Sequence, residues 1–189
     1  MDVAKCFLRG ISPYSQSKAH FTEKLPKEKA DDYEDRTWRE RLHVDEESGF
    51  VCIPPMAIKN YLSECAKYLS MQVVGKGKNT YTKHFEAGVL VDRPLCLGIK
   101  KEDVKGELLF VSSDGRRGGG TRVRKYFPYI APNWSGSVQV YLLDGTVTQD
   151  VFTTHLEEAG NFIGLGRFRP RNNGFYGRFS VEKIEWSSQ

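Results

Sequence analysis

The chain has 189 residues, of which 39% are hydrophobic and 28% charged, a composition that suits one packed domain. No run of about eighteen apolar residues occurs, so we expect no membrane-spanning helix and no membrane partner. The net charge of +4 lies in the last part of the chain: residues 115–189 hold ten basic and six acidic residues, whereas residues 1–114 hold eighteen of each. Eight of those ten basic residues are arginines, whose planar fork matches phosphate. This distribution favours a polyanion as partner.

The four cysteines, at positions 6, 52, 65 and 96, form no CxxC pair. The histidines at 20, 43, 84 and 155 do not accompany them at metal-ligand spacing. We therefore expect reduced core thiols, no metal and no cofactor. The N-terminus lacks a basic stretch followed by an apolar one, so it does not resemble a secretory signal. Both observations favour a cytoplasmic protein.

Residues 3–11 have the pattern of a first strand, which Ser12-Pro-Tyr-Ser-Gln-Ser-Lys interrupts. Residues 22–48 are rich in charge of both signs and poor in aliphatic residues, which indicates a long excursion from the core. A short apolar strand over 49–53 follows. Apolar residues from Ile58 to Leu69 then recur at helical spacing, with Pro55 suited to the first turn, and predict a helix.

Residues 85–99, 105–113 and 137–143 have the apolar runs of strands, and 177–186 has the pattern of a last strand. A second helix is predicted over about 151–160, with Thr154 and Glu157 as a capping box. This order is typical of an α+β, ferredoxin-like (RRM-like) antiparallel sheet with two helices on one face. We expect a single domain over 1–189, with a charged loop inserted at 12–48 and a basic hairpin inserted at 112–126.

The segment Gly164–Phe179, called the glycine-arginine loop below, carries four glycines and four arginines. Glycine permits positive φ and a close backbone approach, and successive backbone N–H groups bind anions. The interleaved aromatic residues are suited to stack on bases, at about 1–3 kcal/mol per base. In strand-like geometry the arginines share one side and Phe168 faces the other, as a candidate core residue. We interpret the loop as one wall of a groove for a single nucleic-acid strand.

Other interpretations of these segments stay open. The glycine-arginine loop is alternatively a turn with incidental charge, or a site for another anion such as a nucleotide. A dinucleotide fingerprint at Gly164 and Gly166 is disfavoured, because no strand-to-helix turn and no βαβ unit surround it. The hairpin, with five positive charges within residues 116–125, is either a second binding element or a solvated loop.

Four stretches resemble the CRISPR-associated RAMP superfamily, in particular its crRNA-coating backbone subunits. Gly10-Ile-Ser-Pro-Tyr-Ser-Gln-Ser resembles the loop after the first strand. Phe50-Val-Cys-Ile-Pro-Pro-Met-Ala-Ile-Lys-Asn-Tyr-Leu resembles the helix entry IPGSSLKGALR, with Lys59 at the family lysine. The hairpin lies where the family inserts a thumb-like element, and the glycine-arginine loop resembles the family's GxGRxRxxGFGRF loop. Pro55-Met56 departs from the usual Gly-Ser, and the brevity of the chain suits a solitary relative encoded by a phage or mobile element.

The resemblance implies sequence-independent binding of single-stranded RNA, self-association along the strand and contact with CRISPR complex subunits. The residues alone indicate single-stranded RNA or DNA. The candidate nucleic-acid-binding residues are Ser12, Tyr14, Ser15, Gln16, Lys18, Lys59, Arg116, Arg117, Arg122, Arg124, Lys125, Gly164, Gly166, Arg167, Arg169, Arg171, Phe175, Tyr176 and Arg178.

Two alternative functions come from the same resemblance. RAMP relatives include metal-independent endoribonucleases with a histidine near the first helix, and His20, with Tyr14 and Lys18 nearby, is a candidate for acid–base cleavage of RNA. A surface polar role for His20 is the interpretation we favour, so we expect no enzyme. A short relative is also able to displace a subunit from a CRISPR complex, as an anti-CRISPR protein does, with the charged 22–48 segment as its interface.

Overall fold

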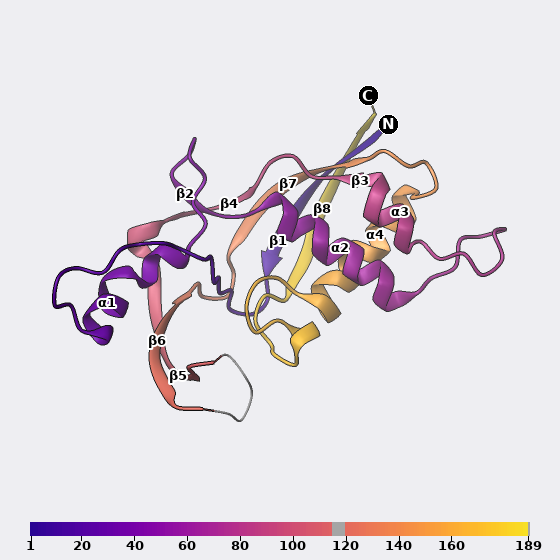
Figure 1. The fold of residues 1–189 in the computed structure, drawn as a ribbon. Helices are drawn as coiled ribbons and strands as arrows, with labels where there is room; N and C mark the ends of the chain where they lie inside the picture. The colour runs from indigo at the N-terminus through magenta and orange to yellow at the C-terminus, as the bar shows by residue number, and fades with distance from the viewer. Residues whose placement is uncertain (115–119, 189) are drawn as a thin grey trace.

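The computed structural model describes residues 1–114 and 120–188. Its main sheet has four antiparallel strands in the order β3-β7-β1-β8, namely β1 (Asp2–Gly10), β3 (Val89–Leu90), β7 (Ser135–Leu142) and β8 (Phe179–Ser188). β1 lies inside the sheet between β7 and β8 (Figure 1). Along β1, Cys6 and Leu8 are buried while Lys5 and Arg9 are exposed, so one face of the sheet carries the core.

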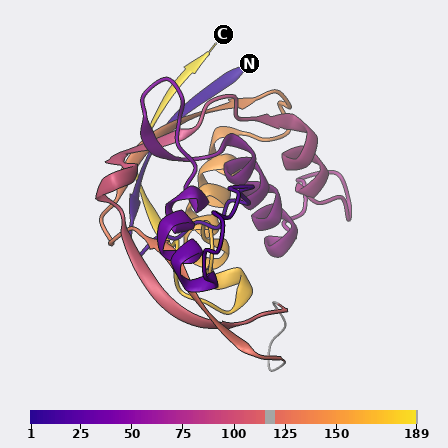
Figure 2. The ribbon, with the colours of Figure 1, turned by 60° about the vertical axis from the view of Figure 1, so that its left-hand side comes forward.

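Two helices cover the core face of this sheet, as Figure 2 shows. The first is α2 (Pro55–Leu69), which buries the predicted apolar stripe and has proline in its first turn, as expected. The second is α4 (Gln149–Glu158), followed by the π-helical turn η3 (Ala159–Ile163). The predicted capping box is wrong, because Thr154 donates its hydroxyl to a carbonyl inside the helix. Thr148 is the N-cap, and its hydroxyl oxygen accepts a hydrogen bond from the Val151 N–H.

The prediction of one strand over 85–99 is wrong. Its start belongs to the short helix α3 (Thr82–Gly88), because Phe85 turns inward and stacks on the His155 ring at 4.4 Å between centroids. The helix ends at Gly88, where a Cβ would collide with Asp144. The chain then forms β3 and afterwards β4 (Leu95–Lys100), which leaves the main sheet and pairs with β2 (Phe50–Ile53) as a separate ribbon.

The inserted hairpin consists of β5 (Lys105–Ser112) and β6 (Arg122–Tyr129), so it begins earlier than the predicted 112–126. It projects from the body of the protein (Figure 1). The charged excursion forms α1 (Ala30–Thr37) and the turn η1 (Trp38–Arg41), which pack against the hairpin through Trp38 and Tyr126. The turn η2 (Lys101–Asp103) joins β4 to β5.

All four cysteines are free, but Cys96 is only half-buried and is not a core thiol. Within residues 1–114 and 120–188, no helix has the length and apolar character needed to cross a membrane.

Candidate nucleic-acid interface

The glycine-arginine loop lies directly against the loop that follows β1, residues 10–17. The Arg167 N–H donates to the Ser15 carbonyl at 2.9 Å, and the Gly177 N–H donates to the Pro13 carbonyl at 2.7 Å. These backbone contacts bring together two segments far apart in the sequence, both of which contribute candidate nucleic-acid-binding residues. Since each loop satisfies polar groups of the other, neither is a freely moving surface segment.

The glycines of this loop serve that packing. Gly166, at φ +71°, lies so close to Ser15 that a Cβ would collide with its carbonyl oxygen. Gly177, at φ +73°, lies in the same way against the Leu165 carbonyl. The close approach predicted for a ligand is therefore made first by the protein's own backbone.

Most candidate residues of the loop after β1 point into the protein. Ser12, Tyr14, Ser15 and Gln16 are all buried, and only Lys18 is exposed. Burial raises the pKa of the Tyr14 hydroxyl, and its ring packs beside Trp134. These buried residues shape the loop and do not present side chains to a ligand.

Gln16 is the clearest example of this structural role. Its amide donates to the Cys52 carbonyl at 2.7 Å and to the Tyr14 hydroxyl at 2.9 Å, and its carbonyl oxygen accepts from the His43 N–H at 2.7 Å. Through these hydrogen bonds, Gln16 thus holds the loop after β1 against the β2–β4 ribbon.

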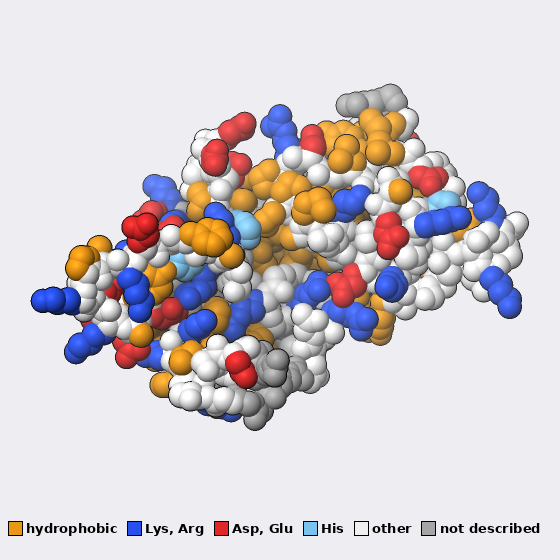
Figure 3. All heavy atoms as spheres, viewed as in Figure 1, with side chains coloured by type: hydrophobic (Ala, Val, Ile, Leu, Met, Phe, Trp, Pro, Cys, Tyr) orange, Lys and Arg blue, Asp and Glu red, His pale blue; other side chains and the backbone are white. Residues whose placement is uncertain are grey.

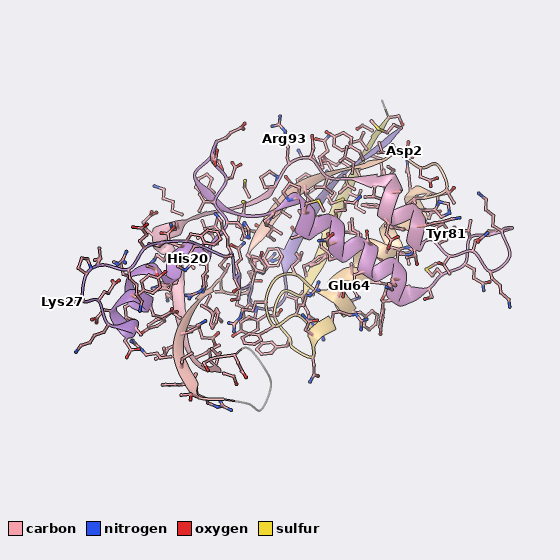
Figure 4. All side chains as sticks on the ribbon, viewed as in Figure 1. Asp2, His20, Lys27, Glu64, Tyr81 and Arg93 are labelled. Atoms are coloured by element: carbon pink, nitrogen blue, oxygen red, sulfur yellow. The ribbon has the colours of Figure 1, made fainter. Side chains whose placement is uncertain are left out.

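Three of the four loop arginines are bound within the protein. Arg169 and Arg171 both pair with Glu64 of α2, at 2.9 and 3.3 Å. Glu64 lies on the side of α2 that faces the loop (Figure 4). Arg178 donates to the Asn161 carbonyl at 2.8 Å. These bonds fix the loop on α2 and η3, and leave two of the arginine charges partly neutralised.

Arg167 has a different environment. Its guanidinium carbon lies 3.0 Å from the ring centroid of Phe127 on β6 and 4.0 Å from that of Phe168. Burial lowers its pKa to about 10, so the group is charged at neutral pH. In the part of the chain that the structure describes, no carboxylate lies within ion-pair distance of it, and its Nη1 atom is buried without a hydrogen-bond partner.

The aromatic residues of the loop divide into two buried rings, Tyr176 and Phe179, and two exposed rings, Phe168 and Phe175. Tyr176 is buried and donates to both carboxylate oxygens of Glu107, at 3.0 and 3.1 Å; burial and this acceptor raise its pKa to about 12. Phe175 is 60% exposed and Phe168 40% exposed, and each stands nearly perpendicular to the Tyr176 ring.

The prediction that Phe168 is a core residue is therefore wrong. The loop does not run as a strand but turns through η4 (Pro170–Asn172), and Phe168 adopts a left-handed φ of +55°. This turn places the Arg167 guanidinium inward, against Phe127, and leaves the Phe168 ring partly exposed.

The two faces of the hairpin carry different residues. On one face Arg124 pairs with Asp35 of α1 at 3.0 Å. On the other face Phe127 and Glu107, directly opposite each other, contact the glycine-arginine loop.

A cavity of about 580 Å³ between α1 and β6 is lined by residues that include Arg122, Arg124 and Lys125. Arg116 and Arg117 lie outside the described residues.

The basic residues thus lie on both sides of the hairpin. Figure 3 shows Lys and Arg side chains on either side of the hollow between the α1–hairpin part and α2, with Asp and Glu side chains among them. The surface is mixed in charge, so the unpaired Arg167 is more distinctive than the number of cations.

Two candidate residues lie away from this interface. Lys59 donates to the carbonyls of Glu86 and Val89 at 2.7 and 3.1 Å, so it caps the end of α3. His20 lies beside α1 (Figure 4), where its ring stacks on Tyr33. Its proposed partner Tyr14 is buried, so the hydroxyl of Tyr14 is not available to a substrate.

Sequence reasoning missed Phe127 and Arg41, which complete the aromatic–cation cluster. Arg41 is almost fully buried, pairs with Glu34 at 2.7 Å, and lies 5.5 Å from the Phe127 ring. The sequence does not distinguish Arg41 as a buried residue, because it lies in the charged excursion among many other basic residues.

The antiparallel sheets and the covering helices are consistent with a RAMP-like fold. The chain resembles Cmr6 from Pyrococcus furiosus, with a TM-score of 0.51 at 14% identity, over 96% of this chain and 99% of Cmr6. It also resembles a chain in the structure of Type III-B Cmr-beta bound to cognate target RNA, with a TM-score of 0.55 at 12% identity over 98% of this chain. The present chain covers 60% of the length of that second protein. No protein-family description and no curated protein sequence matches the chain.

Proposed function

We propose that this chain binds single-stranded RNA, without sequence preference, where the glycine-arginine loop meets the base of the hairpin. Arg167 is the observation that carries the proposal. Among the described residues Arg167 makes no ion pair, and the carboxylate of Glu107 attracts it from a longer distance. A partly desolvated charge without an ion-pair partner lowers the stability of a folded protein, and such groups concentrate at ligand sites. A phosphate would supply a direct ion pair through charge-assisted hydrogen bonds to the half-buried guanidinium.

The exposed rings support a nucleic acid over a simple anion. Phe175 is fixed against the buried Tyr176, so its exposed ring is held in place before a ligand binds. A base stacked on such a ring contributes about 1–3 kcal/mol, and stacking accepts every base. Phosphate contacts carry no sequence information either, which is consistent with a binder that does not discriminate between sequences.

The strand order supports the finer assignment of the fold as ferredoxin-like. α2 lies in the chain between β1 and β3, α4 lies between β7 and β8, and the order β3-β7-β1-β8 places the first and third of these strands at the centre. This order supports the split arrangement of a β-α-β-β-α-β unit, with the hairpin and the β2–β4 ribbon as additions. The open face of the sheet is then the face opposite α2 and α4.

The likeness to a chain in the structure of Type III-B Cmr-beta bound to cognate target RNA supports RNA and other subunits as partners. In our proposal the protein is a cytoplasmic, non-enzymatic RNA-coating subunit or a solitary homologue, without cofactor, that associates with itself along the strand. Metal-independent endoribonuclease activity of His20 and displacement of a CRISPR complex subunit stay alternatives to this proposal.

Fluorescence anisotropy with labelled single-stranded RNA, at two salt concentrations, tests the proposal. We expect two unrelated sequences to bind equally, single strands to bind more tightly than duplex RNA, and affinity to fall steeply with salt because bound phosphates release counterions. Phe175→Ala should weaken binding about tenfold, since it removes about 1–2 kcal/mol of stacking. Absence of binding at low salt would refute the proposal. The same samples on a denaturing gel, beside His20→Ala, show whether RNA is cut.

A further inference from the structure

Cys52 of β2 and Cys96 of β4 occupy directly opposite positions in the antiparallel ribbon. Directly opposite residues of antiparallel strands have Cα atoms about 4.5–5.5 Å apart and side chains on the same face. Disulfides need a Cα separation of about 4.4–6.8 Å. The pairing of Cys52 with Cys96, beside a register shift in this ribbon, therefore brings two free cysteines to positions typical of a cross-strand disulfide.

Both cysteines also line a cavity of about 710 Å³ that is open to solvent. The cavity lies between the ribbon and the segments that hold His43, Asp45 and Arg93; Figure 4 labels Arg93 at this end of the molecule. Cys96 is half-buried, and its sulfur lies 3.6 Å from the Ser48 hydroxyl. Cys52 is more deeply placed, and burial raises the pKa of its thiol to about 11. The two thiols differ in access, and Cys96 is the one that a reagent meets first.

We propose that Cys52 and Cys96 form a redox-reactive dithiol site that reacts with low-molecular-weight disulfides such as glutathione disulfide. The Cys96 thiolate attacks one sulfur of glutathione disulfide, which forms a mixed disulfide and releases one glutathione thiolate. The Cys52 thiolate then attacks the Cys96 sulfur, which forms the cross-strand disulfide and releases the second glutathione. The two protons from the cysteines end on the two glutathione thiols, so the protein loses two electrons and glutathione disulfide gains them.

The other two cysteines provide a control within the same chain. Cys6 and Cys65 are fully buried, and burial raises the pKa of each thiol to about 12. They line neither this cavity nor the ribbon. Reaction at Cys52 and Cys96 alone therefore distinguishes a built dithiol site from general oxidation of cysteines.

The site also has a connection to the loop after β1. The Cys52 carbonyl accepts the Gln16 amide at 2.7 Å, and the Cys52 N–H donates to the His43 carbonyl at 3.0 Å. A disulfide would hold β2 against β4. Gln16 already links the loop after β1 to β2. We expect the oxidised protein to have a higher Tm than the reduced one.

Incubation of the full chain with glutathione disulfide, followed by intact mass spectrometry and a non-reducing digest, tests the proposal. We expect loss of two hydrogens, a cross-linked peptide pair that contains Cys52 and Cys96, and a fall from four to two in the free thiols counted after denaturation. Cys52→Ser should stop at the mixed disulfide on Cys96, and dithiothreitol should reverse both products. A cross-link through Cys6 or Cys65, a terminal mixed disulfide in the wild type, or no reaction would each overturn the proposal. The readout is independent of RNA binding.

Discussion

The glycine-arginine loop and the β5–β6 hairpin are both basic and glycine-containing, but the fold holds them differently. Backbone hydrogen bonds bind the loop to the loop after β1, and ion pairs bind it to α2. The hairpin projects from the body and contacts the rest of the protein mainly through its base and through α1. Charge in a sequence therefore does not equal charge available to a ligand. In the loop, the available cation is Arg167, which rests on aromatic rings and not on a carboxylate.

Replacement of a loop glycine should have the largest effect. Gly177→Ala introduces a Cβ that collides with the Leu165 carbonyl, at a φ that disfavours side chains. We expect a loss of about 3 kcal/mol in the free energy of unfolding, measured with urea, together with weakened RNA binding. Gly145→Ala is the matched control, since its Cβ would meet nothing within 4 Å, and should change stability by no more than about 0.5 kcal/mol. Equal effects of the two substitutions would show that the loop is not held by its glycines.

Arg167→Met separates binding from stability. Methionine fills the space between Phe127 and Phe168 and removes a partly desolvated charge, so stability should stay within about 1 kcal/mol of the wild type or rise. RNA affinity should fall about tenfold or more, because a charge-assisted hydrogen bond contributes about 1.5–3 kcal/mol.

Arg171→Met is the control for Arg167→Met, since Arg171 is half-exposed and pairs with Glu64. It should weaken RNA binding less. If the two variants bind RNA equally, Arg167 is not the distinctive cation that we infer, and the net charge of the loop determines affinity.

The hairpin should contribute less to RNA affinity than Arg167 does, and mainly through long-range electrostatic attraction. Arg122→Gln, Arg124→Gln and Lys125→Gln combined should weaken RNA binding about three- to tenfold and reduce the salt slope by up to about two, at about 0.7 per phosphate contact. Stability should hardly change, because the ion pair between Arg124 and Asp35 is a surface pair.

Lys76, Lys78 and Lys83, near α3 at the other end of the molecule, give a control with the same change in net charge when all three become Gln. If this control weakens RNA binding as much as the hairpin variant, the hairpin has no particular role.

Local patterns in the sequence predicted the helix Pro55–Leu69, the first and last strands and the projecting basic hairpin. They failed where tertiary contacts decide the local structure. Residues 82–88 are helical because Phe85 packs on His155, a residue seventy positions later. The RAMP resemblance agrees with the fold of the structural neighbours at the level of a RAMP-like fold.

Tertiary contacts also limited how much of the candidate site could be predicted from the sequence. The sequence indicated the loop after β1 and the glycine-arginine loop as separate candidate binding segments, and the structure brings them together. It could not indicate that Ser12, Tyr14, Ser15 and Gln16 point inward, because polar side chains in a loop are exposed by default. Nor could it show which arginines find a carboxylate, since Glu64 is about a hundred residues away from Arg169.

The smallest expected effect concerns the contact that joins the two regions. Tyr176 donates to Glu107 of β5, so Tyr176→Phe removes a hydrogen bond between the loop and the base of the hairpin. We expect a loss of under about 1 kcal/mol in stability, because water can solvate the freed carboxylate, and faster amide exchange in β5 and β6. Tyr68→Phe, at a half-exposed ring on α2, should leave this exchange unchanged. If Tyr176→Phe also leaves it unchanged, the hairpin is held by its packing on α1 and not by the loop, and the two regions are mechanically separate.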